Sequence, residues 1–166
     1  MALADRASRV GLARRVVLAA LLASALPTGT ALAQQNAPGQ PRLETVEIVT
    51  ARGRTRFMVE IAATPAQQQR GLMFRKALAP DRGMLFTYAK PQPAAFWMKN
   101  TLIPLDILYI AANGRVLSIA RNAQSHNLTP IPSGGPILGV LEIAGGRAAQ
   151  LGVLPGDRVL HRIFPK

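Results

Sequence analysis

Cysteine is absent from the 166 residues of this chain. Its absence excludes disulfide bonds, thiolate metal sites, thiol catalysis and lipid attachment at a cysteine, so the folded part must rest on its hydrophobic core. Aromatic residues are scarce as well, with one Trp, two Tyr and five Phe. None of them alternates with Arg or Lys in the way that a base-stacking strip requires, and we expect no nucleic-acid partner.

Hydrophobic runs long enough to cross a membrane are also missing. The longest, residues 16–26, has 11 residues, whereas a membrane-spanning helix needs about 20. It follows an Arg-rich stretch and precedes Ala-Leu-Ala at 31–33, which places small residues at −3 and −1 of a cleavage site. This order predicts a signal peptide over residues 1–33, cleaved after about Ala33, and a periplasmic or secreted protein with no transmembrane segment in its mature chain.

Acidic residues are few: eight Asp and Glu stand against 20 Lys and Arg, which gives a formal net charge of +12. The predicted signal peptide carries four Arg and one Asp, so the mature chain would have a charge of +9. A charge of this sign favours an anionic component of the cell envelope or a small polar ligand as the partner. The basic residues are scattered, without a run of five or six.

What remains after the signal peptide divides into two parts. Residues 34–42 are rich in Gln, Pro and Gly and have no apolar period, so we expect a disordered leader there. Residues 43–166 form a single predicted domain, which is long enough for one hydrophobic core.

Short β-rich segments separated by turn residues predominate in this domain. The alternating segments 44–50 and 55–61 predict a hairpin, and the apolar segment 105–110 predicts a strand buried on both faces. A Thr64-Pro65 cap signal and residues 146–151 predict two short helices. Because no regular strand–helix alternation is seen, we expect a mainly β fold, a compact antiparallel sandwich or barrel with one or two short helices.

Proline and glycine mark the predicted interruptions. Pro91 and Pro93 are expected to end a short strand over 83–88. Residues 122–136 hold three Pro and two Gly without periodicity, and are expected to form a long loop. The Asn113-Gly114 pair predicts a hairpin turn.

Several segments resemble a known family. The most specific is 96–107, and the others, in the family's order, are 70–75, 83–86, 140–143, and Gly152 with 155–159. Over about residues 45–164 the chain resembles the family called domain of unknown function 192, found in bacteria and archaea. The resemblance implies a compact, mainly β, jelly-roll-like fold and no established activity. Some members carry cysteines in the loop before residues 140–143. This chain has Pro130, Pro132 and Ser133 in that region, so a thiol role cannot be carried over.

The 96–107 segment supplies the first candidate ligand-binding residues, Trp97, Lys99, Asn100 and Asp106. A carboxylate in an apolar strand needs a partner, because an isolated buried charge costs several kcal/mol. Asp106 either caps the tight turn over 100–104 or forms with Lys99 and Asn100 a pocket for a polar ligand. Trp97 is either a core residue or a stacking surface.

Three further candidates lie outside that segment. Arg70 and Arg75 either clamp a carboxylate or phosphate or lie in solvent at the end of a helix. Glu142 either forms a structural ion pair with Arg70, Lys99 or Arg158, or joins Asp106 in a glycosidase-like carboxylate pair.

No metal site or cofactor is expected, because His126 and His161 are far apart and no ligand motif surrounds them. No catalytic residue is identified, and an enzyme is the less favoured class. The leading hypothesis is a non-enzymatic periplasmic module that binds a polar ligand or an envelope partner. The alternatives are an enzyme acting on envelope polysaccharide through Asp106 and Glu142, and a structural or assembly protein without a small-molecule site.

Overall fold

The computed structural model describes residues 43–165. The predicted signal peptide and leader lie outside these residues. Along the chain the elements are β1 (Leu43–Thr50), β2 (Gly53–Ala62), α1 (Pro65–Arg70), β3 (Arg82–Gln92), β4 (Ala95–Phe96), β5 (Leu105–Ile110), β6 (Val116–Ala123), β7 (Ile131–Pro132), β8 (Ile137–Ala144), α2 (Arg147–Leu151) and β9 (Arg158–Leu160). In the part of the chain that these elements span, no helix is long and apolar enough to cross a membrane.

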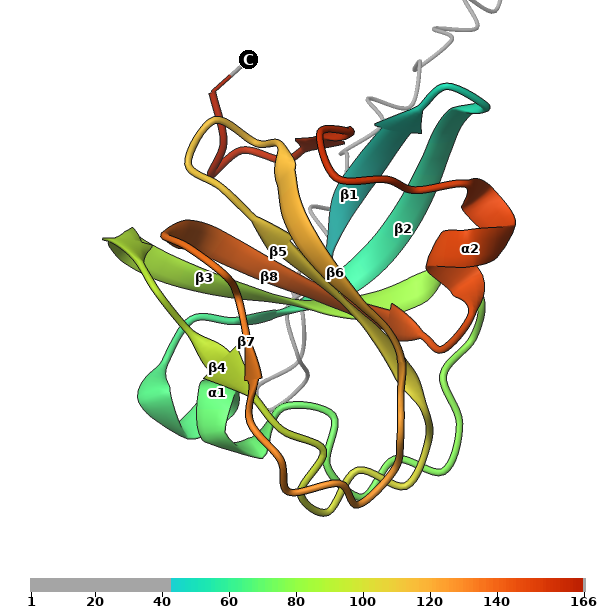
Figure 1. Cartoon of the computed structure of the whole chain (residues 1–166), viewed down its shortest axis with the longest axis vertical. Helices are drawn as coiled ribbons and strands as arrows, with labels where there is room; N and C mark the ends of the chain where they lie inside the picture. The colour runs from blue at the N-terminus through green and yellow to red at the C-terminus, as the bar shows by residue number, and fades with distance from the viewer. Residues whose placement is uncertain (1–42, 166) are drawn as a thin grey trace, which may run out of the picture. The chain divides into compact units, whose positions relative to one another are not determined.

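Seven strands form one curled sheet in the order β6-β5-β8-β3-β2-β1-β9, and β4 pairs with β7 in a separate two-stranded ribbon (Figure 1). The curl brings the two outer strands together at one corner, where Arg115 and Arg158 form a bridge. There the Val159 N–H donates to the Gly114 carbonyl over 2.8 Å. The sheet is therefore a half-barrel, and the prediction of a mainly β fold with two short helices is confirmed.

One strand pair departs from the predicted antiparallel arrangement. β2 and β3 run parallel, with Met58 opposite Arg82 and Ala62 opposite Phe86. A parallel pair needs a crossover connection of a dozen or more residues, and residues 63–81, which contain α1, provide it. This single crossover escaped the sequence analysis because its helix is only six residues long.

Local signals account for the elements at the start of the domain. β1 and β2 form the expected hairpin, with Thr50 opposite Gly53. At α1, the Thr64 hydroxyl accepts from the Gln67 N–H and the Gln67 side chain accepts from the Thr64 N–H, which completes a capping box.

The prolines proved weaker interruptions than expected. β3 continues through Pro91 to Gln92, and the strand end predicted after residue 88 is wrong. Pro91 is tolerated because the ladder with β8 is irregular between Thr87 and Gln92, so no backbone donor is required of it. The predicted long loop over 122–136 also holds the end of β6 and all of β7.

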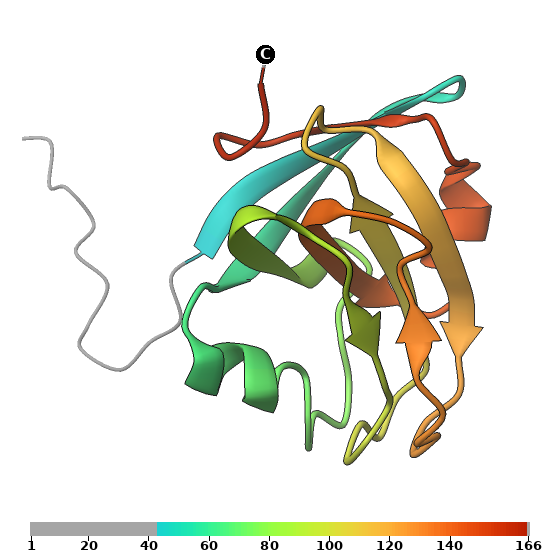
Figure 2. The same ribbon diagram turned by 60° about the vertical axis from the view of Figure 1, so that its left-hand side comes forward.

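Buried side chains form two clusters, one on each face of the sheet around β3, β8 and β5. Leu108 and Ile110 point into the first cluster, inside the half-barrel. Ile107 and Tyr109 point into the second, so β5 is buried on both faces as predicted. The β4–β7 ribbon covers the second cluster, since the ring of Phe96 lies 4.9 Å from that of Phe86 and 6.0 Å from that of Tyr109, centroid to centroid. Figure 2 shows this ribbon in front of the sheet.

Candidate functional site

Asp106 is fully buried, and its carboxylate is satisfied by the backbone. One oxygen accepts from the N–H groups of Asn122 (2.7 Å) and Gly146 (3.0 Å), and the other accepts from Ala148 N–H (2.6 Å). These contacts tie β5 to β6 and fix the start of α2. The interpretation that Asp106 caps the turn over 100–104 is therefore wrong, because its partners come from elsewhere in the fold.

Asp106 and Glu142 project from opposite faces of the sheet. Asp106 pairs across with Ile143, whose side chain belongs to the first cluster together with that of Leu108. Glu142 pairs across with Ile107, a member of the second cluster. Neighbouring positions along a strand alternate in direction, so the two carboxyls cannot share a cavity. The geometry that a glycosidase-like pair requires is absent.

A pocket of about 170 Å³ lies on the second face. It is bounded by α1 with the turn after it, by β3 and β8, and by β4 with the loop that follows. Four of the seven candidate residues from the sequence line this pocket, namely Arg70, Trp97, Lys99 and Glu142. Asp106 and Arg75 are not among the lining residues.

Glu142 is the unusual group of this pocket. It is only 5% exposed, yet within residues 43–165 its carboxyl has no hydrogen-bond or ion-pair partner. The ion pair expected with Arg70, Lys99 or Arg158 is not formed. Burial raises the pKa of Glu142 to about 8. The group is therefore largely a neutral carboxylic acid at pH 7, with one O–H donor and a carbonyl acceptor.

Two tyrosines lie near this acid. Burial raises the pKa of Tyr88 and of Tyr109, and the charge of Glu142 raises both further. The Tyr109 hydroxyl is engaged, because it donates to the Ile131 carbonyl over 2.5 Å. The Tyr88 hydroxyl has no partner among the described residues, and Tyr88 lines the pocket. Tyr88 and Glu142 thus offer two unengaged polar groups.

The rim of the pocket carries cations and an aromatic ring. Trp97 is half exposed, so its interpretation as a core residue is wrong. The Lys99 ammonium lies 5.3 Å from the centre of the Trp97 ring, within cation–π range. Arg70 ends α1 and forms no ion pair within residues 43–165. A neighbouring depression shares Arg70 and Lys99 with the pocket and adds Asn100 to its lining.

Arg75 lies apart from this site. Its guanidinium is 2.5 Å from a carboxylate oxygen of Glu60, and it lines a different depression from Arg70. The proposed clamp of Arg70 and Arg75 is therefore not formed.

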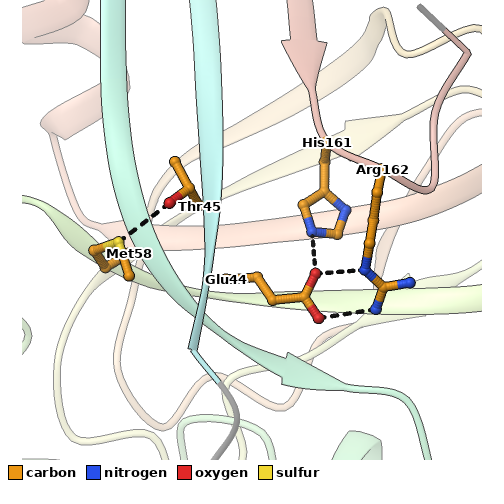
Figure 3. Close-up of polar contacts among 5 residues, drawn as sticks. All are labelled: Glu44, Thr45, Met58, His161 and Arg162. Atoms are coloured by element: carbon orange, nitrogen blue, oxygen red, sulfur yellow. Dashed lines mark hydrogen bonds and ion pairs between the residues drawn. The ribbon is translucent and has the colours of Figure 1, made fainter. Parts of the chain in front are cut away.

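A second polar cluster joins the start of β1 to the segment after β9 (Figure 3). The Glu44 carboxylate receives two bonds from Arg162, at 2.6 and 2.8 Å, and lies 2.9 Å from Nε2 of His161. The hydrogen bond from Arg162 contributes most to holding the pKa of Glu44 down at about 2, whereas burial lowers the pKa of His161. Because Arg162 and His161 both contact Glu44, the cluster holds the two chain segments together.

No group of three or more His, Asp or Glu residues that could hold a metal ion occurs between residues 43 and 165. Sequence reasoning missed Tyr88 and Phe96, which also line the pocket. Alternation along β3 gave a usable signal for Tyr88, because Met84, Phe86 and Tyr88 fall on one face. No such signal existed for Phe96, whose position depends on the pairing of β4 with β7.

Comparisons with known proteins agree with this fold. The profile of the DUF192 family, described as Uncharacterized ACR, matches residues 47–161. A crystal structure of a protein of unknown function from Novosphingobium aromaticivorans DSM 12444 is 44% identical, with a TM-score of 0.73, and the match covers 76% of this chain and 90% of that one. A protein from Sinorhizobium meliloti 1021, provisionally assigned as a transcription regulator, is 43% identical, with a TM-score of 0.71 and coverage of 73% and 95%. The search of curated proteins found no match.

Proposed function

Since the chain belongs to the uncharacterised DUF192 family, we propose from its own site that it is an exported, non-enzymatic module that binds a small polar ligand in the pocket above Glu142. One observation carries the proposal: the buried Glu142 carboxyl lines this pocket and has no partner among residues 43–165. Leaving such a group unsatisfied costs about 1–3 kcal/mol. A ligand that hydrogen-bonds to it recovers that free energy.

The groups around the pocket indicate the chemistry of the ligand. The neutral Glu142 acid donates one hydrogen bond and accepts another, and the Tyr88 hydroxyl can do the same. Arg70 and Lys99 at the rim favour an anionic group. The volume of about 170 Å³ is below the roughly 300–1,000 Å³ of drug-sized sites. A small hydroxylated carboxylate, or a single acidic unit at the end of a longer envelope molecule, meets these conditions.

A binding role fits the site better than catalysis. Acid–base catalysis on a glycoside needs two carboxyls facing one substrate. Glu142 is alone in its pocket, and the Asp106 carboxylate is engaged by three backbone donors on the other face. The assignment of the Sinorhizobium relative as a transcription regulator is not extended to this chain, because its two described helices have six and five residues, too short for a recognition helix.

Export is supported by the order of basic, apolar and small residues in positions 1–33. Fractionation of cells that express the full chain, followed by mass measurement of the recovered protein, tests it. We expect a periplasmic or secreted product that begins near Gln34. A cytoplasmic product that retains residue 1 would contradict export.

The ligand proposal is tested by thermal-shift and calorimetric screening of hydroxy acids, sugar acids, neutral sugars and cell-wall fragments. We expect acidic, hydroxylated compounds to raise the melting temperature, and the rise to disappear in Lys99→Ala and Trp97→Ala. Lys90→Ala is the matched control, since Lys90 is an exposed lysine that does not line the pocket. If no compound stabilises the wild type, the structural or assembly role becomes the better account.

A further inference from the structure

Three loops meet at one end of the domain. They comprise residues 71–80, 97–104 and 124–130, and we call them together the loop end. Both Figure 1 and Figure 2 show them gathered below the sheet. The backbone bonds that join them run, donor first, from Phe74 to Asn100 (2.9 Å), from Met98 to Asn127 (2.8 Å) and from His126 to Thr101 (3.2 Å). The three loops of the loop end are therefore joined through their backbones.

The loop end concentrates exposed apolar side chains. Seven large hydrophobic residues are exposed within residues 43–165, and four of them belong to it: Phe74 (57%), Trp97 (50%), Leu102 (39%) and Leu128 (60%). Single exposed hydrophobic residues need no explanation, but a group of them on one surface marks an interaction site.

Phe74 adds a second and independent observation. Its φ is 63°, in the left-handed region that a bulky residue rarely adopts and that costs free energy. The bond from its N–H to the Asn100 carbonyl holds this conformation. The strain is not offset by burial, because Phe74 is 57% exposed. A backbone conformation that costs free energy is therefore kept at an exposed aromatic residue.

The charges of the loop end have one sign. Residues 71–80, 97–104 and 124–130 contain no Asp or Glu, and the exposed Asp81 follows the first of these stretches directly. Arg75 is paired with Glu60, but Lys76 and Lys99 form no ion pair with any described residue. The surface is thus apolar and cationic, in a chain whose predicted mature form carries nine more positive than negative charges.

We propose that the loop end docks onto an anionic lipid bilayer, with Phe74, Trp97 and Leu128 at the interface and Lys76 and Lys99 against the headgroups. Trp, Phe and Leu beside lysine is the composition of surfaces that lie in the membrane interface. Each basic residue adds attraction to an anionic leaflet. The docking surface shares Trp97 and Lys99 with the rim of the pocket, but its test variant is at Phe74, which does not line the pocket, so the two proposals fail separately.

The chain supplies its own probe, because Trp97 is the only tryptophan in the sequence. The exported form, identified by its mass, is mixed with vesicles of phosphatidylglycerol and phosphatidylcholine, and separately with vesicles of phosphatidylcholine alone. We expect the Trp97 emission to shift to the blue with the anionic vesicles only, and the shift to weaken as salt is added.

The decisive variant is Phe74→Asn, because Asn tolerates the left-handed conformation and the fold should persist. We expect it to lower the vesicle partition coefficient by about tenfold. Leu154→Asn is the matched control, since Leu154 is 58% exposed but lies outside the loop end, and it should bind as the wild type does. The absence of a spectral shift with anionic vesicles overturns the proposal and leaves a protein partner for this surface. Equal binding by the Phe74→Asn variant and the control also overturns it.

Discussion

The two buried carboxyls of the central strands differ in their hydrogen-bond partners. This difference distinguishes a carboxyl that stabilises the fold from one that marks a binding site. Asp106 on β5 is enclosed by three backbone N–H donors. Glu142 on the neighbouring strand β8 is nearly as buried but has no partner within residues 43–165. A buried carboxylate that accepts several hydrogen bonds stabilises the fold. An acid buried without a partner lowers the free energy of unfolding, and such groups are tolerated at sites that bind or react.

The sheet itself explains how neighbouring strands can carry such different groups. Asp106 points into the half-barrel, where backbone N–H groups at the start of α2 donate to its carboxylate. Glu142 points to the other face, where β4 and the end of α1 leave a pocket. Each face thus has its own chemistry, and substitutions on the two faces should have separable effects.

The largest loss of stability is expected from Asp106→Asn. An amide presents an NH₂ group to at least one of the three backbone donors, so we expect the free energy of unfolding to fall by about 3 kcal/mol. Urea denaturation at pH 7 measures the change. Ligand affinity in the folded variant should be unchanged. If the variant keeps its stability but loses ligand binding, Asp106 rather than Glu142 belongs to the binding site, and the account is contradicted.

Glu142→Gln should raise the free energy of unfolding rather than lower it. The pKa of Glu142 rises from an ordinary 4.5 to about 8 on folding, so the folded state binds the extra proton and stability falls as pH rises between these values. At pH 6 the variant should be about 2 kcal/mol more stable than the wild type, and at pH 4 it should be equal to it. Urea midpoints from pH 4 to 9 measure this. A wild-type stability that rises over the same range would contradict it.

The same residue should make ligand binding depend on pH. Because an anionic ligand needs the protonated acid as a donor, its affinity should fall by about tenfold for each pH unit above 8. Gln donates and accepts as the neutral acid does, so Glu142→Gln should retain binding and lose this dependence. Calorimetry at pH 7 and 9 compares the two proteins. Affinity that rises with pH would indicate a cationic ligand instead.

Glu44 offers a third carboxyl, with cations as partners, and the smallest expected effect. Its pKa is lowered to about 2, chiefly by the hydrogen bond from Arg162, so its contribution is present above pH 4.5 and lost as pH falls toward 2. Glu44→Gln should cost about 1 kcal/mol at pH 6, since Arg162 is exposed. Urea unfolding of both proteins at pH 6 and pH 3 should show the difference shrinking. A constant difference would assign the effect to packing.

The sequence allowed good prediction where the signal was local. The capping box at Thr64 and the double burial of 105–110 depend on residues a few positions apart, and both are found in the structure. The partners of Asp106 could not be predicted, because Gly146 and Ala148 lie 40 and 42 residues along the chain. The protonation state of Glu142 could not be predicted either, because it depends on which side chains of the folded chain lie within hydrogen-bonding distance of its carboxyl.

Direct titration of the Glu142 carboxyl tests the central claim. Carbon-13 NMR of the side-chain carboxyls, with Glu142→Gln used to assign the resonance, follows the protonation of this residue in the free protein. The account predicts an apparent pKa near 8. A pKa close to 4.5 would mean that solvent or a partner satisfies the carboxylate, and the pocket would lose the feature that marks it as a binding site.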